Sequence, residues 1–375
     1  MVRFYTDVVS EIEREERTSM TKERDSLIDV VKGIGIISIV IGHASWEISI
    51  AGYKFAVGPF VYLYHLAVFL FCSGCLYKDN YETFEQFIAK KIKGLMYPFI
   101  TYSIIYLCCR NIFLGLGILD GKKFTLGELA IHLTNIVTFN SINELLSAFW
   151  FVPMMFFSII IFAAIRFLTR WIEMIRLREI SRCVLYVVVG LVGLYTTEQQ
   201  YGLLYNMQIS YLLLPVLAIG YYFNKHNGKR FVNIFGLGFV TIIMIFVLKS
   251  DIGIIELSKF MIINKYLFYP VTFCGIYFCL GVAKYITRIK VVEKALSCAG
   301  RYSFDIMAMH FLAFKLVDFV VCNFRGEQVV LSVFPHSYVE LWPLYYIIGV
   351  VFPIIVRIVF DKIVRVVINK ICNKR

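Results

Sequence analysis

Long apolar runs constrain this chain more than any other feature. Several stretches of about 20 residues are almost free of charge, and the first of them covers residues 27–50. A helix rises about 1.5 Å per residue, so such a run spans the hydrocarbon core of a bilayer. In lipid the backbone must satisfy its own hydrogen bonds, and these runs are too long for barrel strands. The pattern predicts an all-α bundle of transmembrane helices.

The composition agrees with that class. Of the 375 residues, 59% are hydrophobic and 17% are charged, whereas soluble domains average roughly 45–50% and about 25%. The formal net charge of +12 would suit nucleic acid, but the basic residues lie between the apolar runs, which is typical of membrane orientation. We therefore expect a multi-pass membrane protein without a nucleic-acid partner. No metal is expected, and the sequence does not indicate an oligomeric state.

The distribution of Lys and Arg predicts the topology. With a cytoplasmic N-terminus, 29 of the 38 basic residues fall on the cytoplasmic side, so we expect both termini there. Residues 1–26, which show no signal peptide, are expected to be a cytoplasmic segment, and 27–370 a membrane domain. About ten spans are predicted, at residues 28–50, 57–77, 92–114, 147–169, 183–197, 208–223, 231–249, 260–284, 303–323 and 341–367. The region 253–284 is long enough to form either one span or two.

The first span contains the leading catalytic candidate. Lys32 and His43 are eleven residues apart, about 20° past three full turns, so they share one helix face and are about 16 Å apart along the axis. Gly35, Ser38 and Gly42 form a neighbouring stripe that lets another helix or a ligand approach closely. A histidine within a membrane helix is costly, and its pKa suits a general base. The structural alternative is a buried histidine bonded to one neighbour.

Cations at the predicted cytoplasmic mouth suggest binding of an anion. Asp29 could orient Lys32 there, although the two could also form an ordinary interfacial pair. Residues 77–93 are expected to form a surface helix that leads into the third span. It ends with a cluster of lysines, namely Lys90, Lys91 and Lys93, which suits either a phosphate group or lipid headgroups.

Four further residues are candidates for substrate binding. His65, in the second span, could face His43, and Trp150 begins the fourth span, where an aromatic anchor is the ordinary alternative. Asp305 and His310 lie in the ninth span. An acid in the first turn of a helix also stabilises the helix dipole, so Asp305 has a structural interpretation too.

Taken together, these motifs resemble the acyltransferase-3 family of integral membrane acyltransferases. The ordered set carries the resemblance across nearly the whole chain, because no single apolar motif is specific. The matching pieces are Asp29-x-x-Lys32-Gly33 followed by Gly42-His43; Tyr64-His65 through Phe69 to Ser73-Gly74; the basic run up to Pro98; and Trp150-Phe151-x-Pro153 with Ser303-Phe304-x-Ile306 through to His310.

The resemblance implies a membrane acyltransferase. Such enzymes are understood to move an acyl group, commonly acetyl, from cytosolic acyl-CoA to a hydroxyl of an extracytoplasmic saccharide, here in the cytoplasmic membrane of a bacterium. It implies that His43 is the catalytic histidine, and that Lys32 stands where an arginine is common. Acetyl-CoA is the expected donor and a surface saccharide the expected acceptor. The coenzyme would be bound by Lys32, Lys90, Lys91 and Lys93, and the substrate by Asp29, His65, Trp150, Asp305 and His310.

Other classes remain open at this stage. A transporter or flippase for a glycan or lipid-linked intermediate would move its substrate without consuming acyl-CoA, and we find no internal repeat of the kind common in transporters. A polyprenol-dependent glycosyltransferase would require carboxylates in the first outer loop, but the single carboxylate in residues 45–58 is Glu47. A purely structural or sensing protein would not need a histidine behind a lysine.

Overall fold

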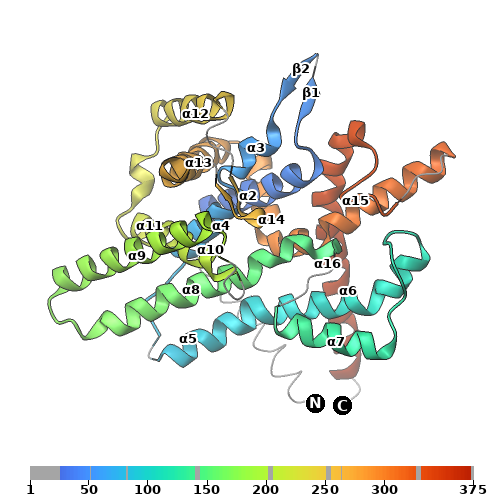
Figure 1. Ribbon diagram of the computed structural model, residues 1–375, viewed down its shortest axis with the longest axis horizontal. Coiled ribbons are helices and arrows are strands. Elements are labelled where there is room, and N and C mark those ends of the chain that lie inside the picture. Colours follow the sequence, from blue (N-terminus) through green and yellow to red (C-terminus); the bar gives the residue numbers. More distant parts are fainter. Residues whose placement is uncertain are drawn as a thin grey trace.

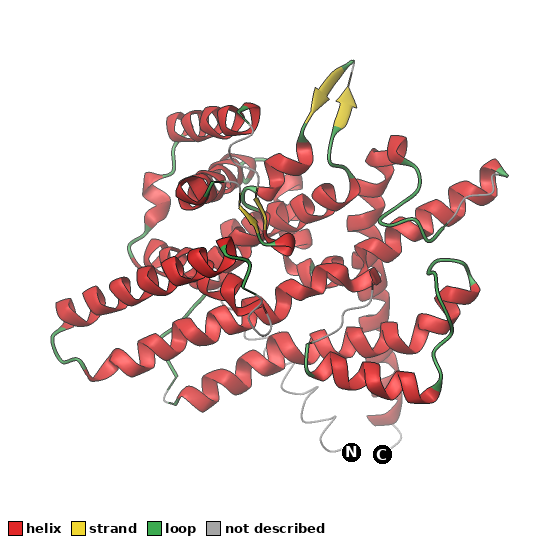
Figure 2. Ribbon diagram, in the orientation of Figure 1, coloured by secondary structure: helices red, strands yellow, loops and turns green. Residues whose placement is uncertain are grey.

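Helices make up nearly all of the computed structural model, which describes residues 26–50, 52–81, 83–139, 144–201, 206–250, 255–262, 264–326 and 331–372 (Figures 1 and 2). Two small antiparallel hairpins are the exceptions to the predicted all-α class. Strand β1 (Ile48–Ile50) pairs with β2 (Tyr53–Phe55), and β3 (Ile255–Glu256) pairs with β4 (Met261–Ile262). The predicted cytoplasmic segment, 1–26, lies outside the described residues except for its last residue.

Six helical segments in the described part of the chain are long and apolar enough to cross a membrane. They are Ser26–Ala44, Val57–Cys75, Phe84–Gly115, Glu144–Trp171, Ile175–Glu198 and Lys265–Ile286. A multi-pass architecture is therefore supported, whereas ten spans and cytoplasmic termini stay predictions. Helices do form at three other predicted spans: α12 (Ile234–Lys249), which has only 16 residues, α15 (Ser303–Arg325) and α16 (Trp342–Cys372).

Helix α2 (Ser26–Ala44) packs against α3 (Val57–Tyr62), α4 (His65–Cys75), α13 (Lys265–Ile286), α14 (Lys290–Arg301), α15 and α16. Its small-residue stripe has the predicted effect. A Cβ atom added at Gly35 would lie 3.1 Å from the Phe69 ring, and one at Gly42 would lie 2.8 Å from the Tyr62 ring. The hydroxyl oxygens of Ser38 and Tyr64 are 3.1 Å apart, so α3 and α4 lie directly against this stripe.

The predicted surface helix is part of a longer helical run. Helix α5 (Phe84–Lys91) continues through a π-helical turn (Ile92–Met96) into α6 (Tyr97–Gly115), so the boundary expected near residue 92 is absent. Helix α7 (Leu126–Val137) lies beside α6 (Figure 1). It begins where Thr125 and Glu128 cap each other's backbone N–H groups, an arrangement that satisfies two donors otherwise left open at a helix start.

Two predicted spans are interrupted. The span at 208–223 divides into α10 (Met207–Leu212) and α11 (Leu214–Lys225), because Pro215 lies in the first turn of α11 and lacks a backbone N–H. The span at 260–284 begins later, at Lys265, where the Asn264 side chain accepts hydrogen bonds from the N–H groups of Tyr266 and Leu267. Hairpin β3–β4 precedes it.

The remaining helices complete the bundle. Helices α8 (Phe151–Leu168) and α9 (Ile175–Glu198) run side by side and meet at one end of the molecule (Figure 1). Short 3-10 turns occupy Glu144–Trp150, Thr169–Trp171, Gly228–Phe231, Leu257–Lys259 and Val339–Leu341.

Candidate active site

His43 lies in the last turn of its span, α2, and not two-thirds of the way across as predicted. The apolar run continues to residue 50, but α2 ends at Ala44 and the chain turns into hairpin β1–β2. The Nε2 atom of His336 lies 2.6 Å from the Ala44 carbonyl oxygen. The His336 N–H therefore donates to one of the carbonyls that a helix end leaves without a partner. His336 was not among the predicted residues, since nothing in its local sequence marks it as a cap.

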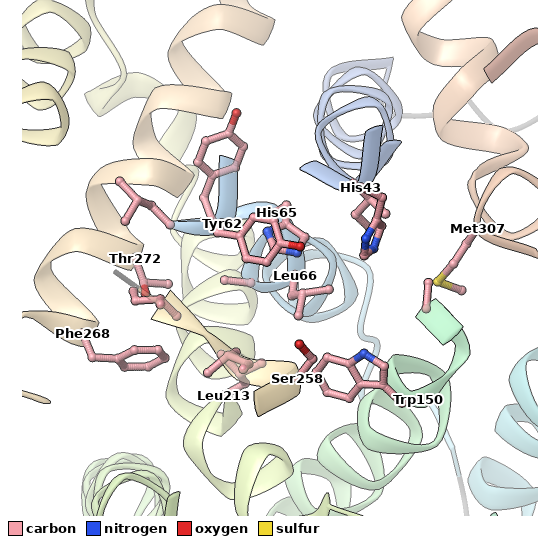
Figure 3. Close-up of a pocket in the computed structure, with 17 residues that line it drawn as sticks. His43, Tyr62, His65, Leu66, Trp150, Leu213, Ser258, Phe268, Thr272 and Met307 are labelled. Atoms are coloured by element: carbon pink, nitrogen blue, oxygen red, sulfur yellow. The ribbon is translucent and has the colours of Figure 1, made fainter. Parts of the chain in front are cut away.

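The His43 ring faces a cavity. The residue is half-buried and lines about 590 Å³ of free space together with His65 and Trp150. Figure 3 shows these three side chains reaching the space from three different elements, with Tyr62 beside them. The structure thus brings together three of the sequence candidates, and His43 is not walled off by aliphatic neighbours.

Interrupted helices build this cavity. Its lining includes Leu63 and Tyr64, between α3 and α4, and Leu213, between α10 and α11. Hairpin β3–β4 and the turn inside it contribute Ile255, Leu257 and Ser258. Non-helical backbone at membrane depth is tolerated where it is buried in protein or lines a cavity. Three separate interruptions that share one cavity therefore mark it as the candidate active site.

Two further histidines surround His43. The rings of His43 and His310 stack with their centroids 5.4 Å apart. The Nδ1 atom of His310 is 3.0 Å from the carbonyl oxygens of Ile306 and Met307, so Nδ1 carries the proton and Nε2 keeps its lone pair. His65 likewise places Nδ1 3.0 Å from the Val61 carbonyl. Backbone contacts thus fix the tautomer of both neighbours of His43.

A second cavity contains the lysines. It includes about 1040 Å³ of free space, part of it open to solvent, and is lined by Lys32, Lys90 and Lys91, with no Asp or Glu among its lining residues in the described part of the chain. Lys32 and Lys91 are half-buried, whereas Lys90 is exposed. Lys93 is also exposed and is not part of the lining. The predicted grouping of Lys32 with the basic run therefore occurs in the structure, without Lys93.

The two cavities meet at one side chain. Met307 of α15 lines both of them. At the start of α8, Trp150 lines the histidine cavity and the next residue, Phe151, lines the lysine cavity. His43 and Lys32 are thus at opposite ends of α2 and face two spaces that share a wall.

Two acidic candidates lie elsewhere. Asp29 is buried against α14, where a Cβ atom added at Gly300 would lie 2.0 Å from the Asp29 carbonyl oxygen. Asp305 accepts a 2.6 Å hydrogen bond from the Tyr102 hydroxyl, and Arg357 lies 3.8 Å from the same carboxylate. Neither residue lines the histidine or the lysine cavity, so their role in substrate binding stays a prediction.

The apolar helices and the enclosed histidines define a polytopic membrane protein with a candidate active site. Comparison with protein families identifies the family of this membrane protein. The model of the acyltransferase-3 family, described as an acyltransferase domain, matches residues 25–361, nearly the whole chain. The protein therefore belongs to the acyltransferase-3 family, as its motifs predicted. No curated protein and no solved structure matches the chain.

Proposed function

We propose that this protein transfers an acyl group, acetyl in the simplest case, from cytosolic acyl-CoA to a hydroxyl of an extracytoplasmic saccharide. One observation supports this proposal above all others. Met307 lines both the lysine cavity and the histidine cavity, so a space for a donor at the lysines adjoins the space that His43 lines.

The lysine cavity suits the donor. Coenzyme A carries several phosphate charges, and a wall with three lysines and no acid among its described residues attracts them. Lys32 and His43 belong to one helix and are about 16 Å apart along its axis, comparable to the reach of an extended pantetheine arm. In this arrangement the nucleotide stays at the lysines while the thioester reaches the histidine cavity.

The histidine cavity suits the chemistry. His43 removes the proton from the acceptor hydroxyl, the oxygen attacks the thioester carbonyl, and a tetrahedral intermediate forms. Its collapse breaks the carbon–sulfur bond, and the proton held by His43 passes to the leaving thiolate. His310 stacks on His43, and this contact supports a role in orienting the His43 ring.

The acceptor side is aromatic. Trp150 and Tyr62 line the same cavity as His43 and offer flat faces together with an N–H and an O–H group. These groups suit a saccharide, whose rings combine apolar faces with hydroxyls at their edges.

Release of free coenzyme A tests the proposal. Full-length protein in lipid vesicles receives acetyl-CoA and a bacterial surface polysaccharide, and a thiol reagent follows the reaction. Loss of a general base lowers rates by roughly 10²–10⁴-fold, so His43→Ala should lose at least about 100-fold. His226→Ala, which alters an exposed histidine, is the matched control and should keep the wild-type rate. Full activity of His43→Ala, or saccharide transport without thiol release, would contradict the proposal.

A further inference from the structure

A third cavity, separate from the two described above, has four arginines in its lining and is called the arginine cavity below. It includes about 960 Å³ of free space, part of it open to solvent, where the end of α8, the start of α9 and the end of α11 meet the loop after α4. Five basic and two acidic residues line it, which leaves a formal net charge of +3. The charged lining residues are Arg166, Arg170, Arg178, Arg182, Lys225, Asp79 and Glu179.

Both carboxylates are already held by neighbouring side chains. Arg166 donates from Nε to Asp79 Oδ1 at 2.7 Å and from Nη2 to Oδ2, and the Tyr221 hydroxyl also donates to Oδ2. Burial raises the pKa of Asp79, but the hydrogen bonds from Arg166 and Tyr221 outweigh it, so the pKa lies below its ordinary value. Glu179 accepts a 2.8 Å hydrogen bond from Arg182. These acids position the arginines without neutralising the whole cavity.

Some of the buried arginine nitrogens still lack acceptors. Only 4% of the Arg166 side chain is exposed, and its Nη1 has no hydrogen-bond partner among the described residues. The same holds for Nε of Arg178. Buried charged donors without acceptors are costly, and a phosphate group, which accepts from guanidinium forks, would satisfy donors of this kind.

Exposed apolar side chains surround the turn between α8 and α9. Leu168 is 77% exposed, Trp171 78%, Met174 68% and Ile175 68%. Ile175 also lines the cavity. These residues lie at the end of two membrane-spanning candidates, where aromatic and aliphatic side chains normally meet the lipid interface. A ligand of this site therefore faces cations on one side and hydrocarbon on the other.

We propose that the arginine cavity binds the headgroup phosphate of an anionic phospholipid, whose acyl chains lie along the apolar side chains at the α8–α9 turn. Basic pockets at the cytoplasmic ends of membrane helices bind anionic headgroups in this way. The cavity shares no lining residue with the lysine cavity, so the proposal does not depend on the acyltransferase mechanism.

A lipid-binding measurement tests the proposal that the arginine cavity binds an anionic phospholipid. Purified full-length protein in detergent is titrated with phosphatidylglycerol or phosphatidylcholine, and bound lipid is counted by native mass spectrometry. The cavity variant is Arg170→Gln with Arg178→Gln. The matched control, Arg230→Gln with Arg288→Gln, removes two exposed arginines that do not line the cavity. We expect the cavity variant to bind phosphatidylglycerol at least tenfold more weakly than wild type, and the control to bind it normally.

Competition distinguishes the sources of phosphate. Coenzyme A and inorganic phosphate at millimolar concentration should leave phosphatidylglycerol bound, and phosphatidylcholine should bind more weakly than phosphatidylglycerol. Equal loss of lipid in the cavity variant and the control would overturn the proposal. Displacement by coenzyme A or inorganic phosphate would overturn it as well, because the site would then recognise a soluble phosphate. Thermal unfolding of both variants without lipid confirms that each one is folded.

Discussion

The lysine and arginine cavities are neighbours with the same sign of charge and different construction. Lys90 lies 5.8 Å from the centre of the Tyr81 ring, and Tyr81 lines the arginine cavity. The lysine cavity contains no acid in its described lining and shares Met307 with the space around His43. In the arginine cavity, two carboxylates hold the guanidinium groups in place. Positive charge alone therefore does not identify a donor site; the partners of the cations and the space that the cavity adjoins are more informative.

Charge reversal in the lysine cavity should have the largest effect. Lys32→Glu combined with Lys91→Glu should raise the KM for acyl-CoA about 100-fold, since each reversal removes an attraction of about 1–2 kcal/mol for the phosphates. The value of kcat should change far less, because neither residue lines the histidine cavity. Steady-state kinetics in vesicles gives both parameters.

Matched reversals sharpen this comparison. Lys229→Glu combined with Lys362→Glu changes the net charge equally at residues outside both basic cavities and should leave KM within about twofold, because surface charges are strongly screened. Arg170→Gln with Arg178→Gln should also preserve KM. A similar rise of KM in all three double variants would show that the donor responds to overall charge and not to the lysine cavity.

Removing a carboxylate from the arginine cavity should affect stability. Asp79→Asn breaks the paired hydrogen bonds to the buried Arg166 side chain, and we expect a loss of about 1–2 kcal/mol because 44% of the Asp79 side chain is exposed and screened by water. The folded-state pKa of Asp79 is depressed. Its contribution is therefore complete above the ordinary carboxyl pKa of about 4 and is lost as the pH falls through the lower folded value.

Thermal unfolding in detergent at pH 7 and near pH 3 measures this effect. The difference between wild type and Asp79→Asn should shrink at the lower pH. Glu173→Gln, which alters an exposed acid on the α8–α9 turn, should unfold like wild type at both values. An Asp79→Asn protein that is as stable as wild type at pH 7 would remove the structural role of this carboxylate.

A larger side chain at Met307, which lines both cavities, should have a smaller effect than the changes above. Met307→Trp adds bulk between the two cavities and should lower the rate of acyl transfer about tenfold, while Met307→Leu, which conserves volume, should change it little. Longer acyl donors should be more strongly affected than acetyl-CoA. If Met307→Trp transfers longer acyl groups at the wild-type rate, the acyl group does not pass this residue.

Much of the arrangement could be predicted from local patterns. The apolar runs predicted membrane helices, the spacing of Lys32 and His43 placed them on one face of one helix, and Gly35 and Gly42 marked where neighbours approach. The family was identified from the same motifs. These features depend on helical periodicity and residue size, which the sequence displays directly.

Features set by tertiary packing could not be predicted in this way. Hydropathy continues to residue 50, so it does not show that α2 ends at Ala44, where His336, almost 300 residues later, supplies the cap. Pro215 stands next to the break at Leu213, although one continuous span was predicted there. The break at Leu63 and Tyr64 has no proline or glycine to mark it. Hairpin β3–β4 is apolar enough to resemble part of a span. These interruptions line the histidine cavity, so the site was harder to predict than the helices around it.

Transfer across a sealed membrane tests the central claim most directly. Protein is reconstituted in vesicles with the saccharide trapped inside. Labelled acetyl-CoA is added to the outer solution, where it reaches only the molecules whose lysine cavity faces outward. The account predicts acetylated saccharide inside the vesicles, with free coenzyme A outside, and neither product from the His43→Ala protein. Acetylation that occurs only when donor and saccharide share one compartment would contradict the claim that His43 is reached from both faces of the membrane.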